Sequence, residues 1–178
     1  MTDFARLMSD YFVKYLAGQK GSGSNTMKTY RDTFVQLLEF MDEKKHIRAD
    51  CIEVDSFSYD IINEFLEYLE KEKRVSISTR NNRLAAIRSF FKYTGYHEPK
   101  YLNISTSIRE ISKKKTEGRQ MNYLSVNAME HFLNSFDKTD HKELRCFCIV
   151  LLLYESGARV TELCNVRRYD LHLEKPYT

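Results

Sequence analysis

Residues that break regular secondary structure are scarce in this chain, which has 6 Gly and 2 Pro among 178 residues. A β-sandwich or β-barrel needs many turns, so this scarcity favours a mainly α-helical fold. The chain also contains 11 Phe and 12 Tyr, and 42% of its residues are hydrophobic, which suffices for a sizeable core. We therefore expect a folded, mainly helical protein rather than a disordered one.

Apolar residues recur at spacings of three and four, which is the periodicity of a helix with one buried face. We expect N-caps at Ser58, Ser78 and Ser125, and helix ends at Gly95 and Gly157. The predicted helices cover residues 3–16, 26–45, 58–73, 79–94, 105–111, a segment from 125, residues 141–155 and a short segment from 160.

The C-terminal residues follow a different pattern. From Tyr169 apolar and polar residues alternate, with Leu171 and Leu173 on either side of His172, which predicts a strand. A single unpaired strand is not stable, so we expect the sequence to be a truncated part of a longer protein. Residues 112–119 hold no apolar side chain and are the best linker candidate. The predicted organisation is a helical domain over 1–111, a basic linker over 112–122 and the start of a second domain over 123–178.

No segment resembles a membrane span or a secretion signal. The longest uninterrupted apolar stretch runs only from Cys148 to Tyr154, and the N-terminus lacks a signal sequence. Four Cys without such a signal are typical of reduced thiols, so we expect a cytoplasmic protein with no membrane partner.

Positive charge is concentrated in one part of the chain. Residues 71–119 contain 13 Lys and Arg against 4 Asp and Glu, a balance of +9, whereas the remaining residues have a balance of −6. This asymmetry indicates an anionic partner, with nucleic acid the leading candidate, although a solvated basic face has the same composition.

The predicted helix over 79–94 mixes cationic and amide side chains with its apolar stripe. Arg80, Arg83 and Arg88 lie on a broad polar side that would reach phosphates, and Asn81 or the neighbouring Asn82 would meet a base edge in the major groove. A solvated helix face is an equally good interpretation. The lysines at 113, 114 and 115 suit phosphate neutralisation, but an exposed hinge without a special role is equally common.

Arg159 follows a helix-breaking Gly157, and Glu162 stands three positions later. An arginine at that position would bind a phosphate or another oxyanion with its two-pronged guanidinium group. The spacing alone favours a plain exposed ion pair between the two side chains. No group of His and Cys has the spacing of a metal site, and no glycine-rich phosphate loop occurs, so we expect neither a metal nor a cofactor.

Several of these segments together resemble the tyrosine recombinase family, also called phage integrases, and most nearly its Xer-type and transposon members. Residues 155–163 (Glu-Ser-Gly-Ala-Arg-Val-Thr-Glu-Leu), followed by Asn165-Val166 and Asp170-Leu171, resemble the family's first arginine motif. Residues 78–93 and 25–30 resemble two helices of its core-binding domain, and residues 113–125 resemble its linker and the opening of its catalytic domain. The implied fold is a SAM-like helical core-binding domain, followed by the truncated first helices of an α+β catalytic domain.

The resemblance implies a reaction in which a tyrosine attacks a DNA phosphodiester and forms a 3′-phosphotyrosyl intermediate, without metal or nucleotide. The family's first catalytic arginine falls on Arg159, where it would stabilise the transition state, and Glu162 would orient that arginine. The family's catalytic lysine, His-x-x-Arg box and nucleophilic tyrosine have no counterpart in the 178 residues. We therefore expect this sequence to bind double-stranded DNA without cleaving it.

The resemblance also adds Lys28 to the expected DNA contacts, because the second and fourth helices would face DNA. The full-length protein would act as a homotetramer on DNA. Two other classes stay open at this point, a non-catalytic helical DNA-binding regulator or accessory factor and a helical protein-interaction adaptor.

Overall fold

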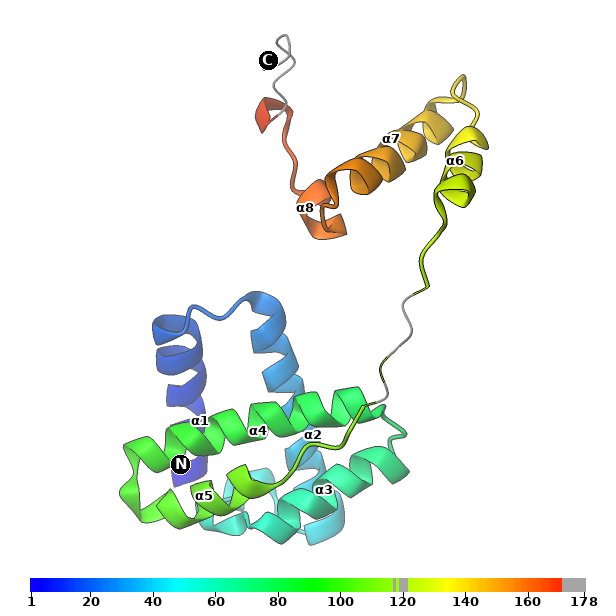
Figure 1. Ribbon diagram of the computed structural model, residues 1–178. Helices are drawn as coiled ribbons and strands as arrows, with labels where there is room; N and C mark the ends of the chain where they lie inside the picture. Colours follow the sequence, from blue (N-terminus) through cyan, green and yellow to red (C-terminus); the bar gives the residue numbers. More distant parts are fainter. Residues whose placement is uncertain (117, 119–121, 171–178) are drawn as a thin grey trace. The chain divides into compact units, whose positions relative to one another are not determined.

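The computed structural model describes residues 1–116, 118 and 122–170, and divides the chain into two compact units, Met1–Gly118 and Arg119–Thr178. The mainly helical fold is confirmed, because every regular element among the described residues is a helix (Figure 1). The strand predicted from Tyr169 is not observed where it can be checked, since Arg168–Asp170 form a 3₁₀ turn, η5. Leu171 and Leu173 lie outside the described residues.

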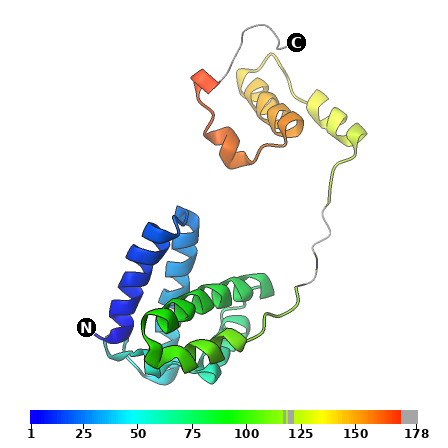
Figure 2. The ribbon, with the colours of Figure 1, turned by 60° about the vertical axis from the view of Figure 1, so that its left-hand side comes forward.

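The first unit consists of five α-helices connected by short 3₁₀ and π-helical segments. In both views, α1 with its continuation η1 lies beside α2, and α4 lies beside α5 (Figures 1 and 2). In chain order the elements are α1 (Asp3–Asp10), η1 (Tyr11–Gln19), α2 (Ser24–Lys45), η2 (Ala49–Cys51), η3 (Val54–Ser56), α3 (Tyr59–Lys71), α4 (Ile77–His97), η4 (Pro99–Tyr101) and α5 (Leu102–Glu110).

The core of the first unit is aromatic, and Phe90 of α4 lies at its centre. Its ring centroid is 5.5 Å from that of Phe4, 5.4 Å from Tyr11, and 5.3 Å from both Phe34 and Phe91. The pairs meet edge to face, the geometry that the quadrupole of aromatic rings favours. These rings come from α1, η1, α2 and α4, so one cluster fixes the positions of four elements.

Helix α4 is longer at both ends than the sequence predicts. Ser76, not Ser78, is its N-cap, and the Ser76 hydroxyl accepts a hydrogen bond of 3.2 Å from the Thr79 amide. Gly95 lies inside the helix rather than at its end. A Cβ on Gly95 would come within 2.7 Å of Ser105 Oγ on α5, so the glycine permits the close approach of these two helices.

Other predicted helix boundaries are confirmed. Ser58 and Ser125 cap α3 and α6, because each hydroxyl accepts a hydrogen bond from the amide three residues later. Gly157 ends α7 with a φ of +63°, a left-handed conformation that glycine adopts readily.

The second unit contains α6 (Val126–Asn134), α7 (His141–Ser156), α8 (Val160–Cys164) and η5. None of its described residues, 122–170, is buried. Even the apolar side chains of α7 are not buried, and Leu152 exposes 50% of its surface. The described helices of this unit therefore do not enclose a core.

Candidate nucleic-acid interface

Three of the predicted DNA contacts are exposed lysines of the first unit. Lys28 lies on α2, and Lys113 and Lys115 lie just after α5. Within the described part of the chain, none of the three forms an ion pair. Their ammonium groups are therefore available to an anionic partner.

Arg83 has a different environment, because its guanidinium group joins α4 to α2. It donates hydrogen bonds to the Thr29 carbonyl oxygen at 2.9 Å and to Thr33 Oγ1 at 3.2 Å. Thr33 is fully buried and itself donates to the Thr29 carbonyl at 2.8 Å. The Arg83 side chain thus satisfies polar groups between two helices as well as carrying positive charge.

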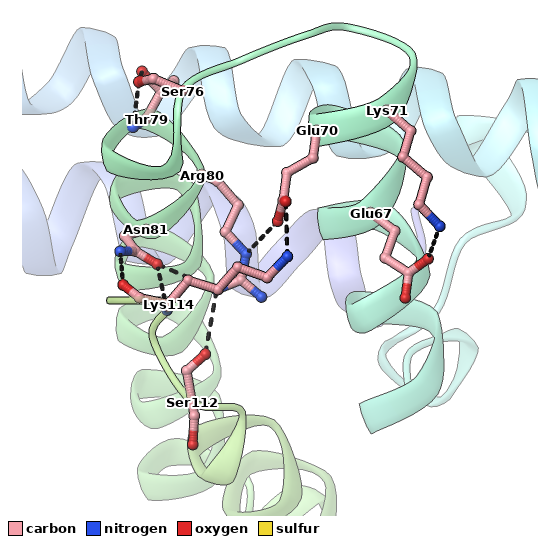
Figure 3. A network of polar contacts seen from close by, with 9 residues as sticks. All are labelled: Glu67, Glu70, Lys71, Ser76, Thr79, Arg80, Asn81, Ser112 and Lys114. Carbon is pink, nitrogen blue, oxygen red and sulfur yellow. Dashed lines mark hydrogen bonds and ion pairs between the residues drawn. The ribbon is translucent and has the colours of Figure 1, made fainter. Parts of the chain in front are cut away.

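Arg80 is also turned inward, and only 5% of its surface is exposed. Its Nε lies 3.2 Å from Glu70 Oε1 on α3, and its Nη1 donates to the Ser112 carbonyl oxygen at 3.2 Å (Figure 3). The position therefore tolerates a charge only because an acidic partner lies beside it.

Asn81 binds the main chain of the segment after α5. Its amide nitrogen donates to the Lys114 carbonyl oxygen at 2.8 Å, and its amide oxygen accepts from the Lys114 N–H at 3.1 Å (Figure 3). The Lys114 ammonium lies 2.7 Å from Glu70 Oε2. One carboxylate thus serves both Arg80 and Lys114.

Arg88 donates a hydrogen bond to the Ile111 carbonyl oxygen. Burial, and then the positive charges of Arg80 and Arg109, lower the pKa of the Arg88 guanidinium below its usual value. The group remains protonated at neutral pH, because the ordinary pKa of arginine is so high. Burial is the larger cause, and the second cause shows that Arg80 and Arg109 add positive charge near this group.

Sequence reasoning does not predict the hollow between α2 and α4, whose residues are mostly of polar types although more of its surface is apolar than polar. It has a volume of about 310 Å³ and is lined by Asn25, Thr26, Thr29 and Tyr30 of α2 and by Asn82 and Ala85 of α4. Asn82 is exposed there, whereas Asn81 is already hydrogen-bonded. Of the two adjacent amides, Asn82 is therefore the one free to meet a base edge, and only the helix packing distinguishes them.

In the second unit, Arg159 and Glu162 are brought together. Glu162 Oε2 accepts from the Arg159 backbone N–H at 2.8 Å, and Arg159 Nη1 lies 2.8 Å from Glu162 Oε1. These two hydrogen bonds, the backbone one first, lower the pKa of the Glu162 carboxyl. The Arg159 side chain is 82% exposed, so the pair holds the guanidinium in place and leaves it accessible.

Other kinds of site are not seen among the residues that the structure describes. No three His, Cys, Asp or Glu side chains there gather in a way that would hold a metal ion. No described helix combines the length and the apolar character needed to span a bilayer.

Known relatives of this chain are recombinases. It is 28% identical to a Sinorhizobium fredii protein named "Putative integrase/recombinase y4rC" over 94% of this chain and 50% of the relative. It is 26% identical to tyrosine recombinase XerC of Staphylococcus aureus (strain USA300) over 92% of this chain and 52% of the relative. The chain thus spans about half the length of these curated relatives.

A solved structure, the crystal structure of XerA recombinase, is 24% identical and aligns with 97% of this chain and 53% of its own, with a TM-score of 0.42. The model of one protein family, described as the phage integrase N-terminal SAM-like domain, matches residues 10–99, which is just over half of the sequence. The match lies within the first structural unit, and it confirms that the chain belongs to the phage integrase family of tyrosine recombinases.

Proposed function

We propose that this chain is the DNA-binding portion of a tyrosine recombinase and that its first unit holds duplex DNA. The observation that carries the proposal is the surface formed by α2, α4 and the residues after α5. It combines an open hollow, lined mostly by residues with hydrogen-bonding side chains, with the exposed lysines Lys28, Lys113 and Lys115. Hydrogen-bonding side chains in a hollow suit base edges, and exposed lysines suit phosphates.

The proposal assigns different tasks to the basic residues named from the sequence. Lys28, Lys113 and Lys115 contact phosphates directly. Arg80, Arg83 and Arg88 contribute positive potential, while their donors hold α2, α3 and the linker in place. Asn81 and Lys114 act through the linker, and Asn82 reaches the bases. The corresponding domain organisation is a DNA-binding domain over 1–111, a linker over 112–122 and the start of a catalytic domain over 123–178.

We further propose that Arg159 binds a non-bridging oxygen of the reacting phosphate and that Glu162 orients it. The Glu162 carboxylate accepts one hydrogen bond from the Arg159 backbone N–H and one from its guanidinium group, whose other donors stay accessible. A preorganised donor of this kind stabilises charge that develops in the transition state. The rest of the family's catalytic set has no match in the 178 residues, so the chain by itself binds DNA without cleaving it.

Fluorescence anisotropy of a labelled 30-base-pair duplex tests DNA binding. Affinity should fall at least about tenfold between 50 and 200 mM salt, because phosphate contacts release counterions. Asn82→Asp places a negative charge at the hollow and should weaken binding about tenfold, whereas Asn103→Asp, an equal change at an exposed position of α5, should not. A DNA affinity that changes neither with salt nor with either substitution would contradict the proposal.

Cleavage has a separate test. The chain is incubated with duplexes that carry candidate recombination sites and then denatured, so that only covalent protein–DNA adducts remain. We expect no adduct. A phosphotyrosyl adduct formed by these 178 residues would show that the chain can cleave DNA.

A further inference from the structure

The segment that follows α5 is held against α4 at three carbonyl groups within four residues. Arg88 binds the carbonyl of Ile111, Arg80 that of Ser112, and Asn81 that of Lys114. All three side chains come from α4.

The contacts differ in how specifically they hold the chain. Arg80 and Arg88 each provide a donor to one carbonyl oxygen. Asn81 binds both the N–H and the C=O of the same residue, Lys114, as a neighbouring β-strand would (Figure 3). Such a two-point contact fixes the backbone orientation at Lys114 as well as its position.

Glu70 completes this arrangement from α3. Its two oxygens lie close to Arg80 Nε, at 3.2 Å, and to Lys114 Nζ, at 2.7 Å. The carboxylate compensates the charge of the nearly buried Arg80 and also turns the Lys114 side chain toward the protein (Figure 3). We call Glu70, Arg80, Asn81 and Arg88 the linker clamp.

The linker clamp gives three consecutive lysines different environments. Lys114 is bound through its main chain and its ammonium group. All three lysines are exposed, Lys114 over 50% of its side-chain surface, but within the described part of the chain no ion pair is seen for Lys113 or Lys115. The sequence Lys-Lys-Lys gives no reason to distinguish the middle residue; the distinction comes entirely from Asn81 and Glu70.

We propose that the linker clamp is a positioning device that fixes the path of residues 111–114 along α4 before any partner binds. The last main-chain contact of the clamp is at Lys114. Lys114 is a structural residue, and Lys113 and Lys115 are the lysines that contact an anionic backbone. The path of the segment follows from the structure alone, whereas the roles of the lysines rest on the DNA binding proposed above.

Amide hydrogen exchange of the whole chain, followed by NMR, tests the path without DNA. The Lys114 N–H should be protected, and Asn81→Ala should speed its exchange about tenfold, the effect of losing one hydrogen bond. Asn82→Ala removes the adjacent, exposed amide and should leave Lys114 protected. The melting temperature of each variant shows that the first unit is folded.

If Asn81→Ala perturbs α4, a second variant still tests the contact between Asn81 and the Lys114 N–H. Asn81→Asp retains an oxygen that accepts from the Lys114 N–H but lacks the donor to the Lys114 carbonyl, so protection of that N–H should persist. A Lys114 amide that exchanges at the rate of an unfolded chain in the unaltered protein would overturn the linker clamp. So would protection that survives Asn81→Ala.

The roles of the lysines are tested by the salt dependence of DNA affinity. Lys113→Gln and Lys115→Gln should each lower the slope of log affinity against log salt by about 0.9, whereas Lys114→Gln should leave the slope unchanged. An equal decrease for all three would overturn the assignment. If the unaltered chain binds no DNA, the proposed function fails together with the lysine assignment, and hydrogen exchange still decides whether the linker clamp exists.

Discussion

The two units use similar helices in different ways. In the first unit, aromatic side chains from α1, η1, α2 and α4 meet around Phe90 and are almost fully buried. In the second, α6 and α7 are also capped by side chains, those of Ser125 and Asp140, but none of the described residues is buried. Capping and periodicity define where helices begin and end, whereas stability requires apolar faces that meet.

The two units also hold their arginines differently. Arg80, Arg83 and Arg88 of the first unit bind carbonyl groups of other segments. Arg159 of the second unit binds only a carboxylate within its own turn and is 82% exposed. The arginines of the first unit connect its segments, whereas the guanidinium group of Arg159 stays exposed to solvent.

Truncation of the aromatic core should have the largest effect. Phe90→Ala should destabilise the first unit by about 3–5 kcal/mol, because it removes a ring that contacts four others and leaves a cavity. Leu152→Ala on half-exposed α7 should cost less than about 0.5 kcal/mol. Scanning calorimetry measures both, and similar losses would mean that the second unit has a comparable core.

The close approach of α4 and α5 gives the next largest effect. Gly95→Ala should destabilise the first unit by about 1–3 kcal/mol, because the new methyl group meets the Ser105 side chain. Urea unfolding measures the loss. The double variant Gly95→Ala with Ser105→Gly removes the collision and should recover part of the stability; a single Gly95→Ala variant as stable as the parent would refute this packing.

The N-cap of α4 should matter less. Ser76→Ala should cost about 1 kcal/mol in urea unfolding, since the Ser76 hydroxyl binds the Thr79 amide. Ser78→Ala should stay within about 0.5 kcal/mol, because Ser78 lies in the first turn and is not the cap. A larger loss of stability for Ser78→Ala than for Ser76→Ala would support the helix start at Ser78 that the sequence predicts.

The smallest effect concerns Glu162, whose pKa is lowered in the folded state. Since the folded pKa lies below the unfolded one, the contribution of this carboxylate to α8 is complete above the unfolded pKa. It is lost as the pH falls through the folded value. A carboxyl-detected NMR titration should show the depressed pKa, and Arg159→Gln should move it upward. An ordinary pKa for Glu162 would contradict the contact with Arg159.

Much of the helical architecture could be predicted from the sequence, because the caps and periodicity are local. Ser58, Ser125 and Gly157 were identified correctly since each acts within its own turn. The helix end predicted at Gly95 is wrong, because this glycine permits a close approach to Ser105, which is ten residues away and on another helix. The sequence also does not distinguish Ser76 from Ser78 as the N-cap of α4, since both are good capping residues followed by helix-compatible sequence.

The candidate site was less accessible to sequence reasoning. Charge and spacing indicate a basic helix, but they cannot tell that Arg80 faces Glu70 or that Asn81 rather than Asn82 holds the linker. Those distinctions arise when α3, α4 and the segment after α5 come together. The Arg159–Glu162 pair is local, and its spacing alone indicated the contact that the structure shows.

The central claim is that DNA affinity belongs to the first unit, and matched charge removal tests it most directly. One variant combines Lys28→Gln, Lys113→Gln and Lys115→Gln; the other combines Lys138→Gln, Lys142→Gln and Arg167→Gln, three exposed cations of the second unit. Anisotropy with a 30-base-pair duplex measures the affinity and salt slope of each variant. The first variant should reduce the slope by about 3 and the affinity at least about tenfold, with the second close to the parent chain. Equal losses for the two variants, or a larger loss for the second, would contradict the account.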